Sequence, residues 1–305
     1  DLEKRYIMSA KTTQKGQKRQ TNGKTTIREQ NNLQICQRLV NLRRELAQLL
    51  GFETYADYVL RHRMASTTEN VYKLLNDLID AYKPTAIHET AEVEALAKKL
   101  EGDDFEMQPW DFGFYSHKLQ MEKYNLDAEM LRPYFQLDKV IDGVFGLANK
   151  LYGITFQENK DIPVYHPDVK AYEVFDKDGS YLAVFYADFF PRKGKQGGAW
   201  MTEFQGQWID HKGNNIRPHV SVVMNFTKPT EEKPALLTLG EVETFLHEFG
   251  HSLHGMFANT RFESLSGTNV WWDFVELPSQ FMGDFSADVC QIITCPTVFR
   301  IHVSV

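Results

Sequence analysis

The sequence predicts a mainly α-helical protein with one small β-sheet. Three observations carry this prediction: apolar residues recur at helical spacing before Gly153, short β-branched and aromatic runs follow it, and the helical spacing returns at Thr238. The chain has 305 residues, of which 42% are hydrophobic and 25% are charged. Such a composition is typical of a globular protein with a sizeable core, in one large domain or two moderate ones.

The helical spacing between Leu33 and about Lys99 predicts three scaffold helices. The first contains leucines at helical spacing and has Gly51 as its stop signal. These leucines are Leu39, Leu42, Leu46, Leu49 and Leu50. The second helix covers Val71–Asp80 and ends before Pro84, and the third covers Ala86–Leu100 with Glu and Lys on its outer face.

A fourth helix is predicted over Asp138–Tyr152, and the sheet follows it over roughly residues 162–226. Asp178-Gly179 stands between two of the predicted strands and indicates a hairpin. The predicted strands are the runs Val164–Pro167, Ala171–Phe175, Tyr181–Tyr186 and Val220–Phe226.

Charge and cysteine content exclude several classes of function. The net charge of −7 does not favour nucleic acid or an acidic membrane surface, and no apolar run approaches the roughly 20 residues of a membrane span. The stretch Lys11–Arg28 holds six basic residues and no acidic one, so residues 1–32 are interpreted as a polar, basic, solvated segment. Three cysteines are too few for a disulfide framework and suggest a reducing, cytoplasmic setting. A monomer is expected.

A helix beginning at Thr238 carries the strongest motif in the chain. Thr238 and Glu241 have the spacing of a capping box. An apolar stripe behind them fixes which side of the helix faces the core. That stripe consists of Val242, Phe245, Leu246, Phe249, Leu253 and Met256. His247 and His251 then lie one turn apart on another face, in the pattern H-E-x-x-H.

The residue types in this motif suit zinc chemistry. Imidazole nitrogens are good zinc ligands, and zinc lowers the pKa of a bound water to about 7. Glu248 is then the general base, which takes the proton and passes it to the leaving amine. Gly250 is interpreted as a place where the sheet or the substrate backbone comes close. The alternative is a chance match on a buried amphipathic helix, with both histidines hydrogen-bonded in the core.

A third protein ligand at suitable range weighs against a chance match. Glu276 is the best candidate, because it follows His251 by 25 residues and completes a His₂Glu set. Asp273 is interpreted as an N-cap or as a hydrogen-bond partner of a ligand histidine. Glu263, in a polar loop, ranks lower, and His254 is expected to be an ordinary surface histidine.

The sequence resembles the thimet oligopeptidase family of zinc peptidases, and within it the peptidyl-dipeptidase branch. The resemblance covers about residues 33–282. It is carried by Phe245–His254, Ser266–Asn269 and Phe274–Gln280, with support from Leu131–Leu137, Ile162–Val169 and Gly197–Met201. It implies a helical, two-lobed protein with a deep channel that admits short unfolded peptides. It also implies one zinc ion held by His247, His251 and Glu276, with Glu248 as the catalytic acid and base.

Two departures from the family pattern limit what the resemblance implies. Residues 283–305 do not resemble the family, and the family's C-terminal lobe, which supplies a Tyr- and Gly-containing loop and a substrate-binding His, does not follow. Trp272 stands where many relatives have Arg. We therefore expect a truncated or frame-altered product whose native-like sequence ends near Met282, so that residues 33–282 form an incomplete catalytic domain.

Three functions remain open on the sequence. The first is a zinc peptidyl-dipeptidase that releases C-terminal dipeptides from short unfolded peptides. The second is an internally cutting oligopeptidase with the same chemistry. The third is a catalytically impaired fragment that binds peptides, against which the full set of His247, Glu248, His251 and Glu276 argues.

Overall fold

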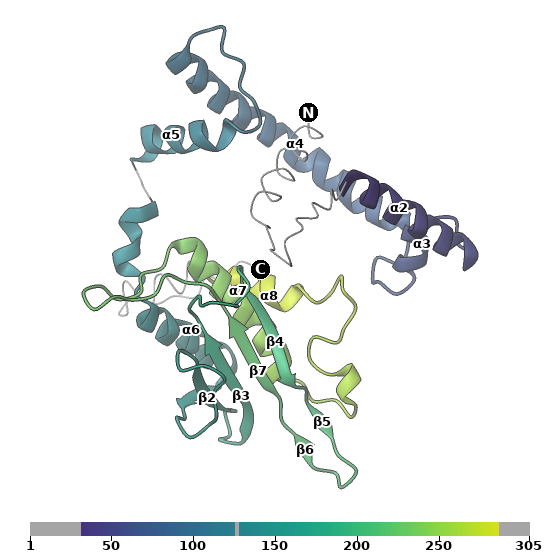
Figure 1. The fold of residues 1–305 in the computed structure, drawn as a ribbon, viewed down its shortest axis with the longest axis vertical. Helices are drawn as coiled ribbons and strands as arrows, with labels where there is room; N and C mark the ends of the chain where they lie inside the picture. Colours follow the sequence, from purple (N-terminus) through teal and green to yellow (C-terminus); the bar gives the residue numbers. More distant parts are fainter. Residues whose placement is uncertain (1–31, 126–127, 287–305) are drawn as a thin grey trace, which may run out of the picture. The chain divides into compact units, whose positions relative to one another are not determined.

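The computed structural model describes residues 32–125 and 128–286 of the chain (Figure 1). The polar segment predicted over residues 1–32 and the atypical tail predicted over 283–305 lie almost wholly outside these residues. The chain divides into two compact units, one ending at Leu75 and the other beginning at Asn76. Within the described residues, no helix is both long enough and apolar enough to cross a bilayer.

The first predicted helix is confirmed as α2, Asn32–Leu49, and the short α3, Tyr55–Leu60, follows it. A capping box between Thr54 and Asp57 begins α3: the Asp57 N–H donates to Thr54 Oγ1, and the Thr54 N–H donates to Asp57 Oδ2. Two donors that a helix start leaves without partners are satisfied in this way.

The prediction of two separate helices around Pro84 is wrong. A single helix, α4, runs from Thr68 to Glu101 with Pro84 inside it. An interior proline removes one backbone hydrogen bond and costs about 3 kcal/mol. Helix-forming residues on both sides, and packing of the distal half through Val93 and Ala97, offset that cost.

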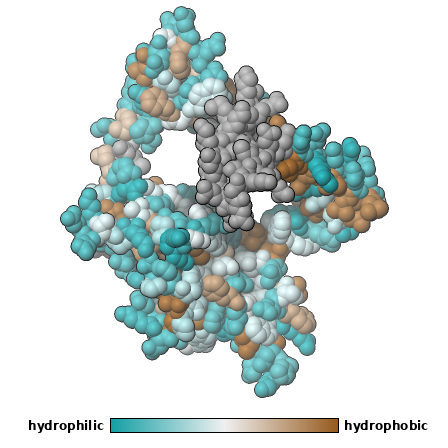
Figure 2. Space-filling view, viewed as in Figure 1, coloured by the Kyte–Doolittle hydropathy of each residue, from teal (hydrophilic) through white to brown (hydrophobic). Residues whose placement is uncertain are grey.

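The apolar residues of α2 do not form a core in the described residues. Ala47 is the one buried residue of the helix. Figure 2 shows hydrophobic side chains gathered over the part that Figure 1 labels α2 and α3. The exposed apolar residues of α2 are Leu33, Ile35, Leu39, Val40, Leu42, Leu46 and Leu49.

The end of α4 packs against α5, Phe112–Tyr124, which the sequence did not predict as a helix. Tyr115 is buried between them and donates a hydrogen bond to Glu101. Two ion pairs, Lys99–Glu122 and Lys123–Glu92, also join the helices. The short 3₁₀ helix η1, Ala128–Tyr134, then leads to α6, Leu137–Tyr152, which confirms the fourth predicted helix.

The main sheet has five strands in the order β1-β2-β3-β7-β4. Strands β3 and β7 pair in parallel, and the other neighbours pair antiparallel. A two-stranded sheet, β5 and β6, accompanies it. The strands are β1 Thr155–Glu158, β2 Lys170–Phe175, β3 Tyr181–Asp188, β4 Trp200–Gln205, β5 Trp208–Ile209, β6 Asn215–Ile216 and β7 His219–Val223.

Most strand predictions are confirmed, and one is wrong. Val164–Pro167 is not a strand: Pro163 precedes the run and Pro167 ends it, and proline supplies no N–H for a ladder. The first strand is instead β1, outside the predicted range. The predicted Asp178-Gly179 turn joins β2 to β3, with Gly179 at φ +82°, a left-handed conformation that favours glycine.

One face of the sheet carries the main core. Helices α6 and α7, Leu239–Met256, pack on this face, where aromatic rings from several elements meet. Phe145 of α6 stacks on Phe156 of β1 at 4.0 Å, and Phe249 of α7 lies edge-on to Phe185 of β3. The opposite face holds a smaller cluster around Val184 and Tyr186. The sheet therefore gives α7 a fixed apolar base.

Arg217 joins the C-terminal end of α7 to the sheet. Its guanidinium donates to the carbonyl oxygens of Met256 and Ala258 at 2.7 and 2.9 Å, and to that of Leu182 in β3 at 2.7 Å. A cation at this end also complements the helix dipole. Burial lowers the pKa of Arg217, but an arginine stays charged at neutral pH.

We expect Arg217→Met to lower the free energy of unfolding by about 2–4 kcal/mol, because it leaves three inward-facing carbonyl groups without their donor. Urea unfolding followed by circular dichroism measures this change. Arg261→Met is the matched control, since Arg261 is exposed beside the Phe262 ring and its replacement should stay within about 0.5 kcal/mol. Equal losses in the two variants would contradict the role given to Arg217.

Candidate metal centre

Helix α7 begins with the predicted capping box. The Thr238 N–H donates to Glu241 Oε2 at 2.7 Å, and the Glu241 N–H donates to Thr238 Oγ1 at 3.1 Å. All six residues of the predicted apolar stripe are buried. The helix is therefore fixed in rotation, which leaves the face with His247 and His251 turned away from the core.

The structure brings His247, His251 and Glu276 together. The two imidazole rings lie 5.1 Å apart at 87°, and the Nε2 atom of each lies 3.2 Å from Glu276 Oε2. Glu276 immediately precedes α8, Leu277–Gly283, which packs against α7. In the described residues, this is the one group of at least three His, Cys, Asp or Glu side chains whose ligand atoms converge.

This geometry fits a zinc ion. Ligand atoms at about 2.0–2.2 Å from zinc in a tetrahedron lie about 3.3–3.6 Å from one another. The observed separations of 3.2 Å between each His Nε2 and Glu276 Oε2 are close to that range. Two neutral imidazoles and one carboxylate also form a donor set that zinc favours, with room for a fourth ligand.

Ser279 orients the carboxylate of Glu276, a contact that sequence reasoning missed. Its hydroxyl donates to Glu276 Oε2 and lies equally close, at 2.8 Å, to the Glu276 carbonyl oxygen. Partial burial acts to raise the pKa of Glu276, but the hydrogen bond from Ser279 and the nearby His251 and His247 outweigh it, so the pKa lies below its usual value. The carboxylate is thus held charged.

Glu248 lies beside this group but is nearly buried, with 8% of its surface exposed. Burial raises the pKa of its carboxyl group. The neighbouring His247 acts to lower the pKa of Glu248, the charge of Glu276 acts to raise it, and a hydrogen bond that the carboxylate accepts from the backbone of Met201 acts to lower it. A carboxylate with a raised pKa is a stronger base, which suits proton abstraction at neutral pH.

The other candidates lie elsewhere. Glu263 accepts the Gly206 N–H and is outside the converging group. The residue before α8 is Glu276 itself, so Asp273 is not its N-cap. The alternative role of Asp273, as a hydrogen-bond partner of a ligand histidine, stays a prediction. His254 is not an ordinary surface residue: its ring packs against Phe274, and its Nδ1 atom is buried without a hydrogen-bond partner in the described part of the chain.

Gly250 is needed for a different contact from the one predicted. A Cβ atom there would lie 2.7 Å from the Ser279 Cα and would also meet the Pro278 carbonyl oxygen, both in α8. The close approach is therefore between α7 and α8, and it brings Glu276 to the histidines.

We expect Gly250→Ala to force α8 away from α7, which lowers zinc affinity at least about 10-fold and stability by about 1–3 kcal/mol. Chelator competition and thermal unfolding measure the two effects. Gly240→Ala in the same helix has open space around its Cβ and should leave zinc affinity unchanged. A Gly250→Ala protein with wild-type zinc affinity would refute the proposed contact.

Strand β4 passes beside the candidate metal centre at Met201, whose backbone contacts Glu248. It is the last strand of the sheet and pairs with β7 on one side. Its other edge pairs with no strand of the described residues. Sequence reasoning did not assign β4 to the site, because strand order cannot be read from local patterns.

Comparisons with known proteins show which family the chain resembles. The model of peptidase family M3 matches residues 10–292. The dipeptidyl carboxypeptidase of Escherichia coli is 47% identical over 247 residues, which cover 81% of this chain and 36% of the relative. Oligopeptidase A of Escherichia coli is 42% identical over 252 residues, covering 82% and 37%.

A more distant relative, the mitochondrial intermediate peptidase of Yarrowia lipolytica, is 34% identical over 283 residues, covering 84% of this chain and 36% of the relative. The chain therefore spans little more than a third of the length of these curated relatives.

Proposed function

The chain belongs to peptidase family M3, and from this premise we propose that it carries the zinc-binding and catalytic centre of a peptidase that acts on short unfolded peptides. The observation that carries the proposal is the convergence of His247, His251 and Glu276 beside the nearly buried Glu248. A binding module has no need of a metal site with an adjacent base of raised pKa.

In the proposed mechanism His247, His251 and Glu276 hold the zinc ion, and Glu248 moves the proton. Zinc, when bound, acidifies water and polarises the scissile carbonyl group. Glu248 accepts a proton from the attacking water, and its carboxylic acid then protonates the nitrogen of the leaving amine as the C–N bond breaks. Burial of Glu248 raises its pKa. The raised pKa favours both the acceptance of the proton from water and the holding of that proton until the amine leaves.

Strand β4 supplies a docking edge for the peptide. Because β4 is the last strand of its sheet, an extended peptide can add to it through backbone hydrogen bonds. Such binding recognises the peptide backbone, so it selects unfolded segments whose backbone groups are free. The expected two-lobed channel, which would exclude folded proteins, is part of the same proposal.

We propose that cleavage releases dipeptides from free C-termini, as in the relative named dipeptidyl carboxypeptidase. Internal cleavage is the second candidate, and the similarity to oligopeptidase A over nearly the same share of the chain supports it. We also propose a monomer in the cytoplasm, because three cysteines suit a reducing compartment.

Hydrolysis of one short peptide in two forms, with a free and with an amidated C-terminus, tests the proposal. We expect zinc-dependent cleavage that a chelator abolishes and added zinc restores, with release of a C-terminal dipeptide from the free form alone. Cleavage of both forms at an internal bond would contradict the release of C-terminal dipeptides and support an internally cutting oligopeptidase. Peptide binding without cleavage in the zinc-loaded protein would refute the catalytic function.

A further inference from the structure

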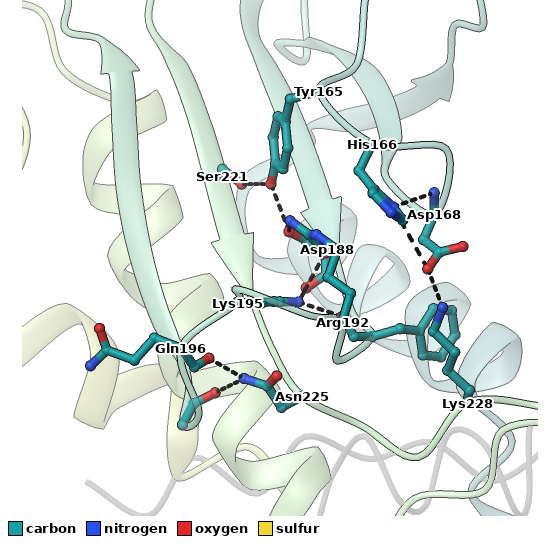
Figure 3. A network of polar contacts seen from close by, with 12 residues as sticks. Tyr165, His166, Asp168, Asp188, Arg192, Lys195, Gln196, Ser221, Asn225 and Lys228 are labelled. Atoms are coloured by element: carbon teal, nitrogen blue, oxygen red, sulfur yellow. Dashed lines mark hydrogen bonds and ion pairs between the residues drawn. The ribbon is translucent and has the colours of Figure 1, made fainter. Parts of the chain in front are cut away.

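A buried polar network lies at the end of β3, where the chain leaves the centre of the sheet (Figure 3). Its centre is Asp188, with 1% of its surface exposed. The carboxylate accepts two hydrogen bonds from Arg192, at 2.7 and 2.8 Å, one from Tyr165 at 2.9 Å and one from Lys195 at 2.9 Å. Burial acts to raise the pKa of Asp188, but these donors outweigh it and keep the pKa below its usual value.

Lys195 uses all three of its ammonium donors within this network. Besides the Asp188 carboxylate, its Nζ atom donates to the carbonyl oxygens of Asp188 and Phe190 at 3.0 and 2.8 Å. Its side chain is 2% exposed. Burial of an ammonium group costs several kcal/mol, which an ion pair repays only in good geometry, so such a pair is a poor source of net stability. Its contacts tie the segment that carries Lys195 to the end of β3.

The segment that Lys195 fixes is the connection from β3 to β4, residues 189–199. Asn225, two residues after β7, holds the other end of it: its amide donates to the carbonyl oxygens of Gln196 and Gly198 at 2.9 and 2.7 Å. The connection contains three glycines, of which Gly194 and Gly198 have φ of +87° and +92°. A segment so rich in glycine has many alternative conformations to lose.

The connection ends at Trp200, the first residue of β4, and Met201 follows with its backbone against Glu248. We propose that Lys195 is a positioning residue for peptide hydrolysis: bound to Asp188, it fixes the connection that places the edge strand β4 against Glu248 and the docked peptide. The inference rests on the proposed function, and it adds a residue that lies outside the metal centre. Asn225 acts from the other side of the same connection.

The test compares three variants of the zinc-loaded full chain. Lys195→Met removes the ammonium group, Lys195→Arg keeps a cation, and Lys193→Met is the control, since Lys193 is an exposed lysine of the same connection. We measure kcat and KM per mole of bound zinc, so that a loss of folded protein does not enter the rates. A displacement of about 1 Å in an active site costs about 10²-fold in rate.

We expect Lys195→Met to lower kcat about 10²-fold with zinc content unchanged, Lys195→Arg to recover part of that loss, and Lys193→Met to match the wild type. A merely structural lysine would lower the melting temperature but leave kcat per bound zinc at the wild-type value. That result would overturn the proposal.

Hydrogen exchange gives a second readout that needs no catalysis. In Lys195→Met, the amides of β4 should exchange at least about 10-fold faster, while the buried amides of α6 keep their wild-type rates. Unchanged exchange in β4 would overturn the positioning role even if the wild type hydrolyses no peptide. A wild type without hydrolysis, combined with faster exchange in β4, would refute the proposed function and leave the placement of β4 by Lys195 supported.

Discussion

Replacing Glu248 by glutamine is expected to lower kcat for peptide hydrolysis by about 10²–10⁴ while zinc remains bound. Glutamine keeps the size of the side chain but has no basic oxygen to accept the proton. The proposed ligands His247, His251 and Glu276 are untouched, so zinc content should stay at the wild-type level. Steady-state kinetics with metal analysis on the same samples measures both quantities.

The same substitution should not destabilise the metal-free protein at neutral pH. Burial raises the pKa of Glu248 in the folded state, so folding favours the protonated carboxyl group. The contribution of Glu248 to stability is therefore lost as the pH rises above the pKa that this group has in the unfolded chain. Glutamine is neutral at every pH and removes this dependence. A large loss of both stability and zinc would show that Glu248 acts as a structural residue, and equal turnover in the two proteins would remove it from catalysis.

Replacing Glu276 by glutamine is expected to weaken zinc binding by more than about 100-fold. Loss of a hydrogen-bond partner of a metal ligand already costs about 10- to 100-fold, and Glu276 is itself the anionic ligand in our proposal. Ser279→Ala, which removes the hydroxyl that orients this carboxylate, should fall in that smaller range. Competition with a chromophoric chelator measures the affinities.

Stability gives an independent measure of the same loss. Zinc at 100 times its dissociation constant should stabilise the wild-type protein by about 2.7 kcal/mol, and the same zinc concentration should stabilise Glu276→Gln far less. Glu263→Gln is the matched control, because Glu263 contacts Gly206 and not the histidines. If Glu263→Gln weakened zinc binding as much as Glu276→Gln, the assignment of the third ligand would be wrong.

The elements that local patterns specify were predictable from the sequence. Helix α7 carries its own capping box and an apolar stripe, so its start and its rotation follow from neighbouring residues. The convergence of Glu276 with the two histidines was a prediction from spacing and residue type. That it lies at the start of α8, and that Gly250 permits the approach, required the structure.

Other features depend on contacts between distant segments. The strand order puts β7 between β3 and β4, and no local pattern specifies such a parallel pairing. Pro84 is a helix breaker by propensity, yet α4 continues through it. The partners of Lys195 could not be inferred, because a lysine in a glycine-rich stretch is most simply a solvated turn residue. The leucines of α2 have the spacing of a buried helix face, yet in the described residues they are exposed.

The strand order has a consequence for folding. His247 and His251 lie on α7 and Glu276 immediately precedes α8, so this candidate centre needs only local chain closure. Strand β4 pairs with β7 and not with β3, so it can join the sheet only after β7, which is later in the sequence, has paired with β3. We therefore expect an intermediate that binds zinc before β4 is in place. Zinc binding would then precede catalytic competence. Metal content alone would overestimate the fraction of fully folded molecules.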